Sequence, residues 1–156
     1  MVDSPDELAR IKQSIIAKEF KDALSALDSF IGQESPPPDA LYMQAVCYRY
    51  TNQLQLALDS LDKLKKVCPD HGRAHQEEGH TYRALGQSQL ALRSYERAIH
   101  YNPALEASLR AQLELLNSKE DSKRVERIQA NLDRLSKIPK PLIGVMDLIS
   151  QGKLLK

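Results

Sequence analysis

The sequence predicts an all-α fold built from repeated pairs of helices. Three observations support this prediction: the chain of 156 residues matches itself at an offset of 34 residues, its apolar residues recur at helical spacing, and no segment shows the alternation of a strand. The composition agrees, because six Gly, no Trp and two Phe give little sign of a β-sandwich or a glycine-rich nucleotide-binding fold.

The 34-residue repeat involves several positions at once. The matched sets are Ala23, Ala57 and Ala91; Leu24, Leu58 and Leu92; Leu27, Leu61 and Tyr95; Tyr48 and Tyr82; and Pro69 and Pro103. So many coincidences in a short chain indicate a repeated structural unit.

One unit, residues 73–103, reads as two helices. The first ends at Gly86, which suits a C-cap, and Asn102-Pro103 ends the second because proline cannot continue the helical hydrogen bonds. The second helix places one apolar face on Leu90, Ala91, Tyr95, Ala98 and Ile99. Gly79 and Ala91 lack bulk, so we expect neighbouring helices to approach closely there while Tyr95 fills the space.

The same reasoning extends along the chain. We expect helices near residues 5–17, 20–32, 39–51, 54–67, 73–85, 88–101, 105–117, 121–137 and 142–151, with linkers at 33–38 and 136–141.

The unit resembles the tetratricopeptide repeat, a helix–turn–helix of 34 residues with small and large residues at fixed positions. The third unit carries the pattern at Gly79, Tyr82, Gly86, Ala91, Tyr95, Ala98 and Pro103. The second unit replaces the turn glycine by Asn52, which also tolerates a left-handed conformation. His75 and Glu78 depart from the pattern, and we expect that corner to be a place where a polar partner is met. The resemblance implies a right-handed solenoid of about four antiparallel helix pairs and a terminal helix.

On this resemblance, residues 1–139 form a helical repeat domain with units at about 4–37, 38–71, 72–105 and 106–139. Residues 140–156 have two interpretations: a capping helix that covers the last repeat, or a truncated fifth repeat, with Gly144, Leu148, Gly152 and Leu154 at the expected positions. We favour truncation, because a turn glycine followed by one apolar pair makes a poor natural ending.

Composition excludes several classes of protein. The 22 basic and 21 acidic residues leave a net charge of +1, which argues against a polybasic nucleic-acid binder. No apolar run approaches the roughly 20 residues of a membrane span, and the acidic N-terminus lacks the apolar segment of a secretory signal. Two cysteines are too few for a disulfide scaffold. We therefore expect a cytoplasmic protein without nucleic-acid or membrane partners.

The sequence gives no support for an enzyme. The histidines lack the spacing of a zinc site, nothing orients a base toward Cys47 or Cys68, and no phosphate-binding glycine loop occurs. We expect no catalytic residue, no metal and no cofactor.

The resemblance implies a concave groove, lined by the first helix of each unit, in which a peptide lies. Its expected lining is Tyr42, Val46, Arg49, Tyr50, Arg73, Gln76, His80, Arg83, Arg110 and Glu114. This surface is aromatic at one end and basic at the other, so it can hold a protein or peptide by stacking, apolar contact and charge-assisted hydrogen bonds.

Two alternatives to a binding scaffold stay open. The degenerate repeats and the proline-rich joint near 140–143 also resemble, more weakly, the N-terminal repeat arrays that precede a sulfotransferase domain in some bacterial proteins. On that reading the chain is an interaction or substrate-positioning arm of a larger enzyme. The other alternative is a self-association module, a homo-oligomer formed through the terminal repeats.

Overall fold

The computed structural model describes residues 5–150, and over these residues every regular element is an α-helix. The predicted all-α fold is confirmed. The chain divides into two compact units, Met1–Pro69 and Asp70–Lys156, which are described separately. The predicted residues Gly152 and Leu154 lie outside the described residues.

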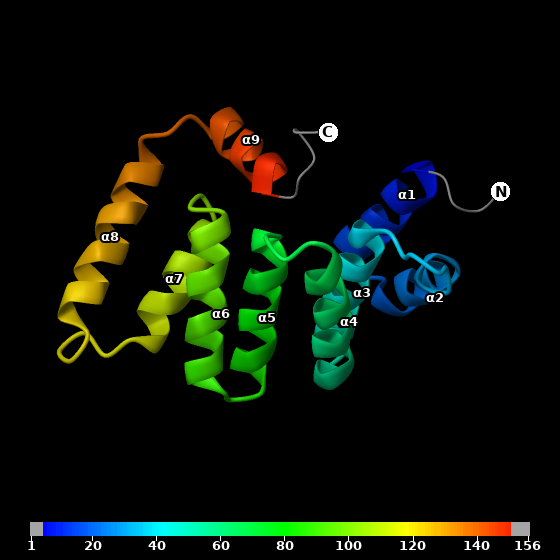
Figure 1. Cartoon of the computed structure of the whole chain (residues 1–156), viewed down its shortest axis with the longest axis horizontal. Helices are drawn as coiled ribbons and strands as arrows, with labels where there is room; N and C mark the ends of the chain where they lie inside the picture. The colour runs from blue at the N-terminus through cyan, green and yellow to red at the C-terminus, as the bar shows by residue number, and fades with distance from the viewer. Residues whose placement is uncertain (1–4, 151–156) are drawn as a thin grey trace. The chain divides into compact units, whose positions relative to one another are not determined.

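The first unit contains two helix pairs (Figure 1). Its helices are α1 (Pro5–Ile16), α2 (Phe20–Ile31), α3 (Pro38–Tyr50) and α4 (Leu54–Val67). Helix α3 contacts the other three, so it is the centre of this unit. Apolar side chains from α1, α2 and α3, including Ile11, Leu27 and Phe30, form a buried core between them.

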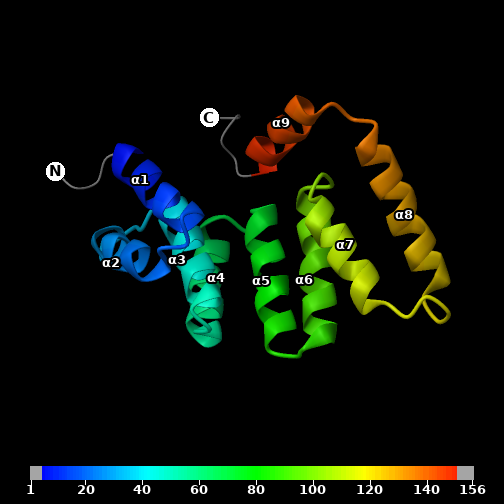
Figure 2. The same ribbon diagram turned by 180° about the vertical axis from the view of Figure 1, so that it is seen from behind.

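Within residues 70–150, the described part of the second unit, there are five helices. They are α5 (Gly72–Ala84), α6 (Ser88–Tyr101), α7 (Glu106–Leu115), α8 (Ser122–Ser136) and α9 (Lys140–Ser150). Helices α5 and α6 lie side by side as an antiparallel pair, and α7 packs against α6, as Figures 1 and 2 show from opposite sides. Helix α8 is less enclosed, because only Ile128 and Leu135 of its 15 residues are buried. Every helix begins and ends within two residues of the boundaries expected from the sequence.

The 34-residue repeat corresponds to buried positions of the fold. The second helix of each of the first three pairs buries three residues in the same register. These sets are Ala23, Ala57 and Ala91; Leu27, Leu61 and Tyr95; and Phe30, Leu64 and Ala98. The predicted close approach at Gly79 is confirmed, since a Cβ placed there would lie 2.6 Å from Cε1 of Tyr95.

The turn inside each of the first three helix pairs uses a left-handed residue at the same place. Gly86 has a φ of 74° and Asn52 a φ of 59°, which confirms the expected role of Asn52. Lys18 stands 34 residues before Asn52 and has a φ of 63°. A lysine at such a position gives no signal in the sequence, because left-handed φ is unusual for a side chain of this kind.

None of the helices in the described part of the chain is long and apolar enough to cross a membrane.

Candidate functional site

In the first unit, the candidate residues on α3 form a partly exposed aromatic surface. Tyr42, Val46 and Arg49 are half-buried, and Tyr50 is 57% exposed. The ring of Tyr50 stacks on Phe20 at a centroid distance of 4.7 Å, and the Arg49 guanidinium lies 4.2 Å from the Tyr50 ring centroid. This surface offers an aromatic face and a positive charge to a partner.

In the second unit, four candidates recur along α5 at spacings of three and four residues, which places them on one face of the helix. They are Arg73, Gln76, His80 and Arg83. Each is held by a side chain of α6, α7 or α9, so the side chains of this α5 face are positioned before any partner arrives.

The neighbouring helices hold the middle and the end of the α5 face. The Ser108 hydroxyl donates a 2.9 Å hydrogen bond to Oε1 of Gln76, which is buried. The Tyr95 hydroxyl and Nδ1 of His80 are 2.8 Å apart. Arg83 forms an ion pair with Glu114 of α7, and this hydrogen bond raises the pKa of Arg83. An arginine is charged at physiological pH with or without this shift, so Arg83 offers a positive charge on the α5 face.

The remaining candidate on α7, Arg110, is exposed and donates a hydrogen bond to Glu106 one turn earlier on the same helix. Such a pair on an exposed helix surface adds little to stability. The Arg110 guanidinium is therefore an exposed charge on α7.

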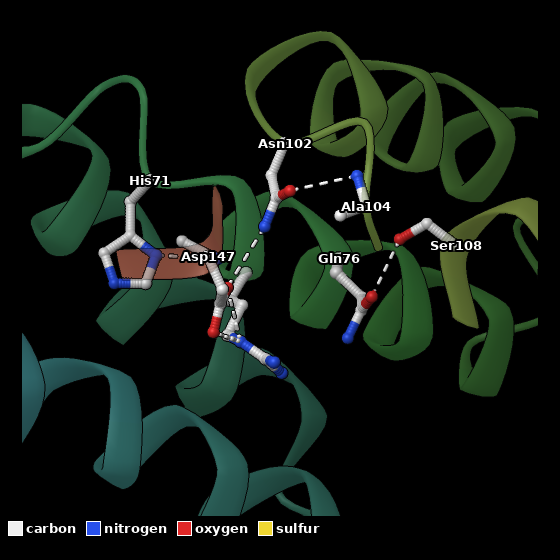
Figure 3. Close-up of polar contacts among 8 residues, drawn as sticks. His71, Gln76, Asn102, Ala104, Ser108 and Asp147 are labelled. Carbon is white, nitrogen blue, oxygen red and sulfur yellow. Dashed lines mark hydrogen bonds and ion pairs between the residues drawn. The ribbon is translucent and has the colours of Figure 1, made fainter. Parts of the chain in front are cut away.

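Arg73, at the start of the α5 face, contacts helix α9, and the sequence did not predict this contact. Nε of Arg73 donates to both carboxylate oxygens of Asp147 on α9, at 2.8 and 2.7 Å. The side-chain amide of Asn102 donates a further 3.1 Å hydrogen bond to the same carboxylate, while its oxygen accepts from the Ala104 amide (Figure 3). Asp147 is only 18% exposed, so these bonds form in partial shelter from water.

A small cavity of about 230 Å³ lies beside this contact within the second unit. Its lining comes from α5, from the start of α7 and from the ends of α8 and α9 that face them. These residues are Arg73, Gln76, Ala104, Leu105, Glu106, Ala107, Leu135 and Ile143. The cavity combines apolar walls with the polar ends of Arg73 and Gln76, a pairing that suits an amphipathic side-chain or peptide contact.

The expectation that His75 and Glu78 mark a polar corner for a partner is wrong. Both side chains are buried. The Ser94 hydroxyl donates a 2.8 Å hydrogen bond to Glu78, and the His75 ring stacks on Tyr101 at 5.2 Å. Since Ser94 and Tyr101 both lie on α6, His75 and Glu78 belong to the contact between α5 and α6. The Ser94 hydroxyl supplies the hydrogen-bond donor that a buried carboxylate requires.

The other polar candidates have structural surroundings. His71 is the N-cap of α5, and its Nδ1 accepts a 3.1 Å hydrogen bond from the Ala74 amide. Cys47 is buried, and Cys68 is half-buried. Within residues 5–150, no three His, Cys, Asp or Glu side chains are grouped so as to hold a metal ion.

Two segments match models of the tetratricopeptide repeat, residues 39–71 and residues 72–105. A small glutamine-rich tetratricopeptide repeat-containing protein 2 of Mycosarcoma maydis is 25% identical over 76% of this chain. A probable UDP-N-acetylglucosamine–peptide N-acetylglucosaminyltransferase SPINDLY of Solanum lycopersicum is 29% identical over 55% of this chain. The chain spans 37% of the length of the first of these relatives and 9% of the second.

Solved structures share the fold. A crystal structure of MamA matches with a TM-score of 0.67 at 16% identity, covering 94% of this chain and 77% of that one. MamA from residue 41 onward, from Desulfovibrio magneticus RS-1, matches with a TM-score of 0.72 at 16% identity, covering 87% of this chain and 77% of that one. At this identity the likeness concerns the arrangement of helices.

Proposed function

Because this chain is a tetratricopeptide-repeat protein, we propose that it is a non-catalytic scaffold that binds a protein or peptide through the first helices of its repeats. The observation that carries the proposal is the α5 face, where Arg73, His80 and Arg83 are each held by a side chain of another helix. Side chains fixed in advance lose little conformational entropy on binding, which favours recognition.

The aromatic surface on α3 supports the same function in the first unit. Tyr50 exposes more than half of its surface although it is large and partly apolar, and Arg49 adds a charge beside it. Tyrosine and arginine are the residue types that most often dominate binding energy at protein interfaces. Candidate contacts are therefore Tyr42, Val46, Arg49 and Tyr50 on α3, and Arg73, His80, Arg83, Arg110 and Glu114 on α5 and α7, with Gln76 positioning the α5 face from beneath.

The experiment that tests the scaffold is capture of partners from a lysate of the source organism by the wild-type chain and by charge-reversal variants. Arg49→Glu and Arg83→Glu alter the two candidate surfaces. Lys63→Glu on α4 and Arg97→Glu on α6 make the same change at exposed positions outside them. We expect the first two variants, but neither control, to lose the captured protein while keeping the wild-type melting temperature. If all four variants retained the captured protein, the partner would not bind at these two surfaces.

A second candidate function is an arm of a larger enzyme that positions substrates. The similarity to part of the SPINDLY protein favours it, since that relative is described as a probable glycosyltransferase of peptides and extends well beyond the matched region. The sulfotransferase-like reading is another form of this candidate. Capture of a set of proteins that all carry one covalent modification would favour the arm, whereas one stable partner, or a concentration-dependent mass of the chain alone, would favour a scaffold or self-association.

A further inference from the structure

Helix α9 is unusual for a helix on the surface of its unit. Its residues are almost all apolar, and Asp147 is its one acidic residue. Leu142, Val145 and Ile149 are among its exposed large side chains, with exposures from 42% to 55%. Helix α9 thus has apolar side chains both toward and away from the unit that it contacts.

One side of α9 contacts the other helices of the second unit through three residues spaced as neighbours on a helix: Ile143, Met146 and Asp147. Ile143 and Met146 pack against the core cluster that contains Leu109 and Leu135. Asp147 adds the hydrogen bonds from Arg73 and Asn102. The side of α9 that faces the rest of its unit therefore offers two aliphatic anchors and one carboxylate, as a helix docked into a groove does.

The position of α9 differs from that of a regular next repeat. Figures 1 and 2 show α9 returning from the end of α8 toward the end of the pair where α5 begins and α6 finishes. Arg73 and Asp147 are 74 residues apart in the sequence. Helix α9 thereby engages a residue of the α5 face, the surface proposed above to bind a partner.

Helix α9 is only weakly attached to the rest of the second unit. None of the described side chains of α9 is fully buried, and its inward residues Ile143, Met146 and Asp147 are half-buried. Arg73 remains 39% exposed in the contact. A helix held by partly buried groups adds less free energy than a core helix, because the area removed from water is smaller.

We infer that α9 is an intrachain occupant of the Arg73 end of the α5 face, and that the partner is a helix of the same chemistry: aliphatic side chains and a carboxylate on one side. This inference rests on the proposed function. The partner's carboxylate replaces Asp147 at Arg73 and Asn102, and its aliphatic residues replace Ile143 and Met146. Because a segment joined by a short linker acts at an effective concentration in the millimolar range, α9 lowers the apparent affinity for the partner.

The test uses the full chain and a labelled synthetic peptide with the sequence of residues 137–150. Asp147→Lys places a cation against Arg73 and should release α9, which hydrogen exchange over residues 140–150 reports. We expect the peptide to bind the Asp147→Lys chain about tenfold or more tightly than wild type, because the competing segment has left. Asp133→Lys on α8 makes the same charge change at an exposed position and should behave as wild type.

A charge swap distinguishes a specific contact from general loosening. In the double variant Arg73→Glu/Asp147→Lys the ion pair is reversed, so exchange over α9 should return toward the wild-type rate and peptide binding should fall again. A peptide carrying lysine at the position of Asp147 should not bind the Asp147→Lys chain. Sedimentation fixes a chain concentration at which the protein is monomeric, so that exchange of α9 between copies does not contribute.

Two results would overturn the inference: unchanged hydrogen exchange of α9 in the Asp147→Lys chain, or no gain in peptide binding once exchange shows that α9 is free. Either result leaves the capture that depends on Arg83 intact, and so leaves the proposed function standing. If Arg83→Glu still captures the lysate protein while Asp147→Lys binds the peptide more tightly as expected, the lysate protein binds somewhere other than the α5 face.

Discussion

The pairs α3/α4 and α5/α6 occupy the same register of the 34-residue repeat. The side chains that fill the contact between the two helices differ in size from one pair to the other. Where α3 carries Ala45, α5 carries Gly79; where α4 carries Leu61, α6 carries Tyr95. Ala45, Leu61 and Tyr95 all have no exposed surface. The smaller residue on the first helix accompanies the larger one on the second, so the repeat preserves the combined volume of two positions.

The same two pairs share a buried polar contact with different chemistry. Ser60 donates a 2.8 Å hydrogen bond to Gln44 between α3 and α4. At the equivalent positions, Ser94 donates a 2.8 Å hydrogen bond to the carboxylate of Glu78. The repeat thus maintains a serine donor and a side-chain oxygen acceptor, and it accepts either a neutral or an acidic group as that acceptor.

The largest effect is expected from Gly79→Ala, because the new methyl group would lie 2.6 Å from Tyr95, whose ring cannot yield as the end of a flexible chain would. Overpacking typically costs about 1–3 kcal/mol of the free energy of unfolding and occasionally more, and this clash with a buried ring should reach about 3 kcal/mol or more. The measurement is unfolding by urea, followed by circular dichroism.

The matched comparison is the double variant Gly79→Ala/Tyr95→Leu, which reproduces Ala45 and Leu61 of the preceding pair. Its loss of stability should be smaller than the sum of the two single losses, since the leucine removes the clash. Simple additivity would show that volume is not exchanged between these two positions.

A smaller effect is expected at the buried polar contact, and it should differ between the pairs. Ser94→Ala removes a hydrogen bond to a buried carboxylate and should cost about 1.5–3 kcal/mol, whereas Ser60→Ala removes one to a neutral amide and should cost about 0.5–1.5 kcal/mol. Urea unfolding of both variants measures the difference. An equal or reversed order would show that the charge of Glu78 is compensated by groups other than Ser94.

Much of the fold could be predicted because its causes are local. The repeat, the turn residue Asn52 and the close approach of Gly79 to Tyr95 all follow from side-chain size and backbone preference at a fixed spacing. The contact of Arg73 with Asp147 could not, because it joins residues 74 positions apart through a helix that turns back toward the start of α5. The burial of Glu78 was missed for a related reason: a charged residue at a core position gives no sign of its partner, Ser94, until the two helices are paired.

The smallest effect is expected at the turns, where Lys18, Asn52 and Gly86 share a left-handed conformation. A side chain in this region costs about 1–2 kcal/mol, less for asparagine. Lys18→Gly should therefore stabilise the chain, by about 0.5 kcal/mol once the greater freedom of glycine in the unfolded state is subtracted. Gly86→Lys makes the reverse change at the equivalent turn and should destabilise it, with Asn52→Gly close to neutral. The midpoint of urea unfolding of the three variants tests the order, and a loss of stability in Lys18→Gly would mean that the lysine side chain contributes more to this turn than its backbone conformation costs.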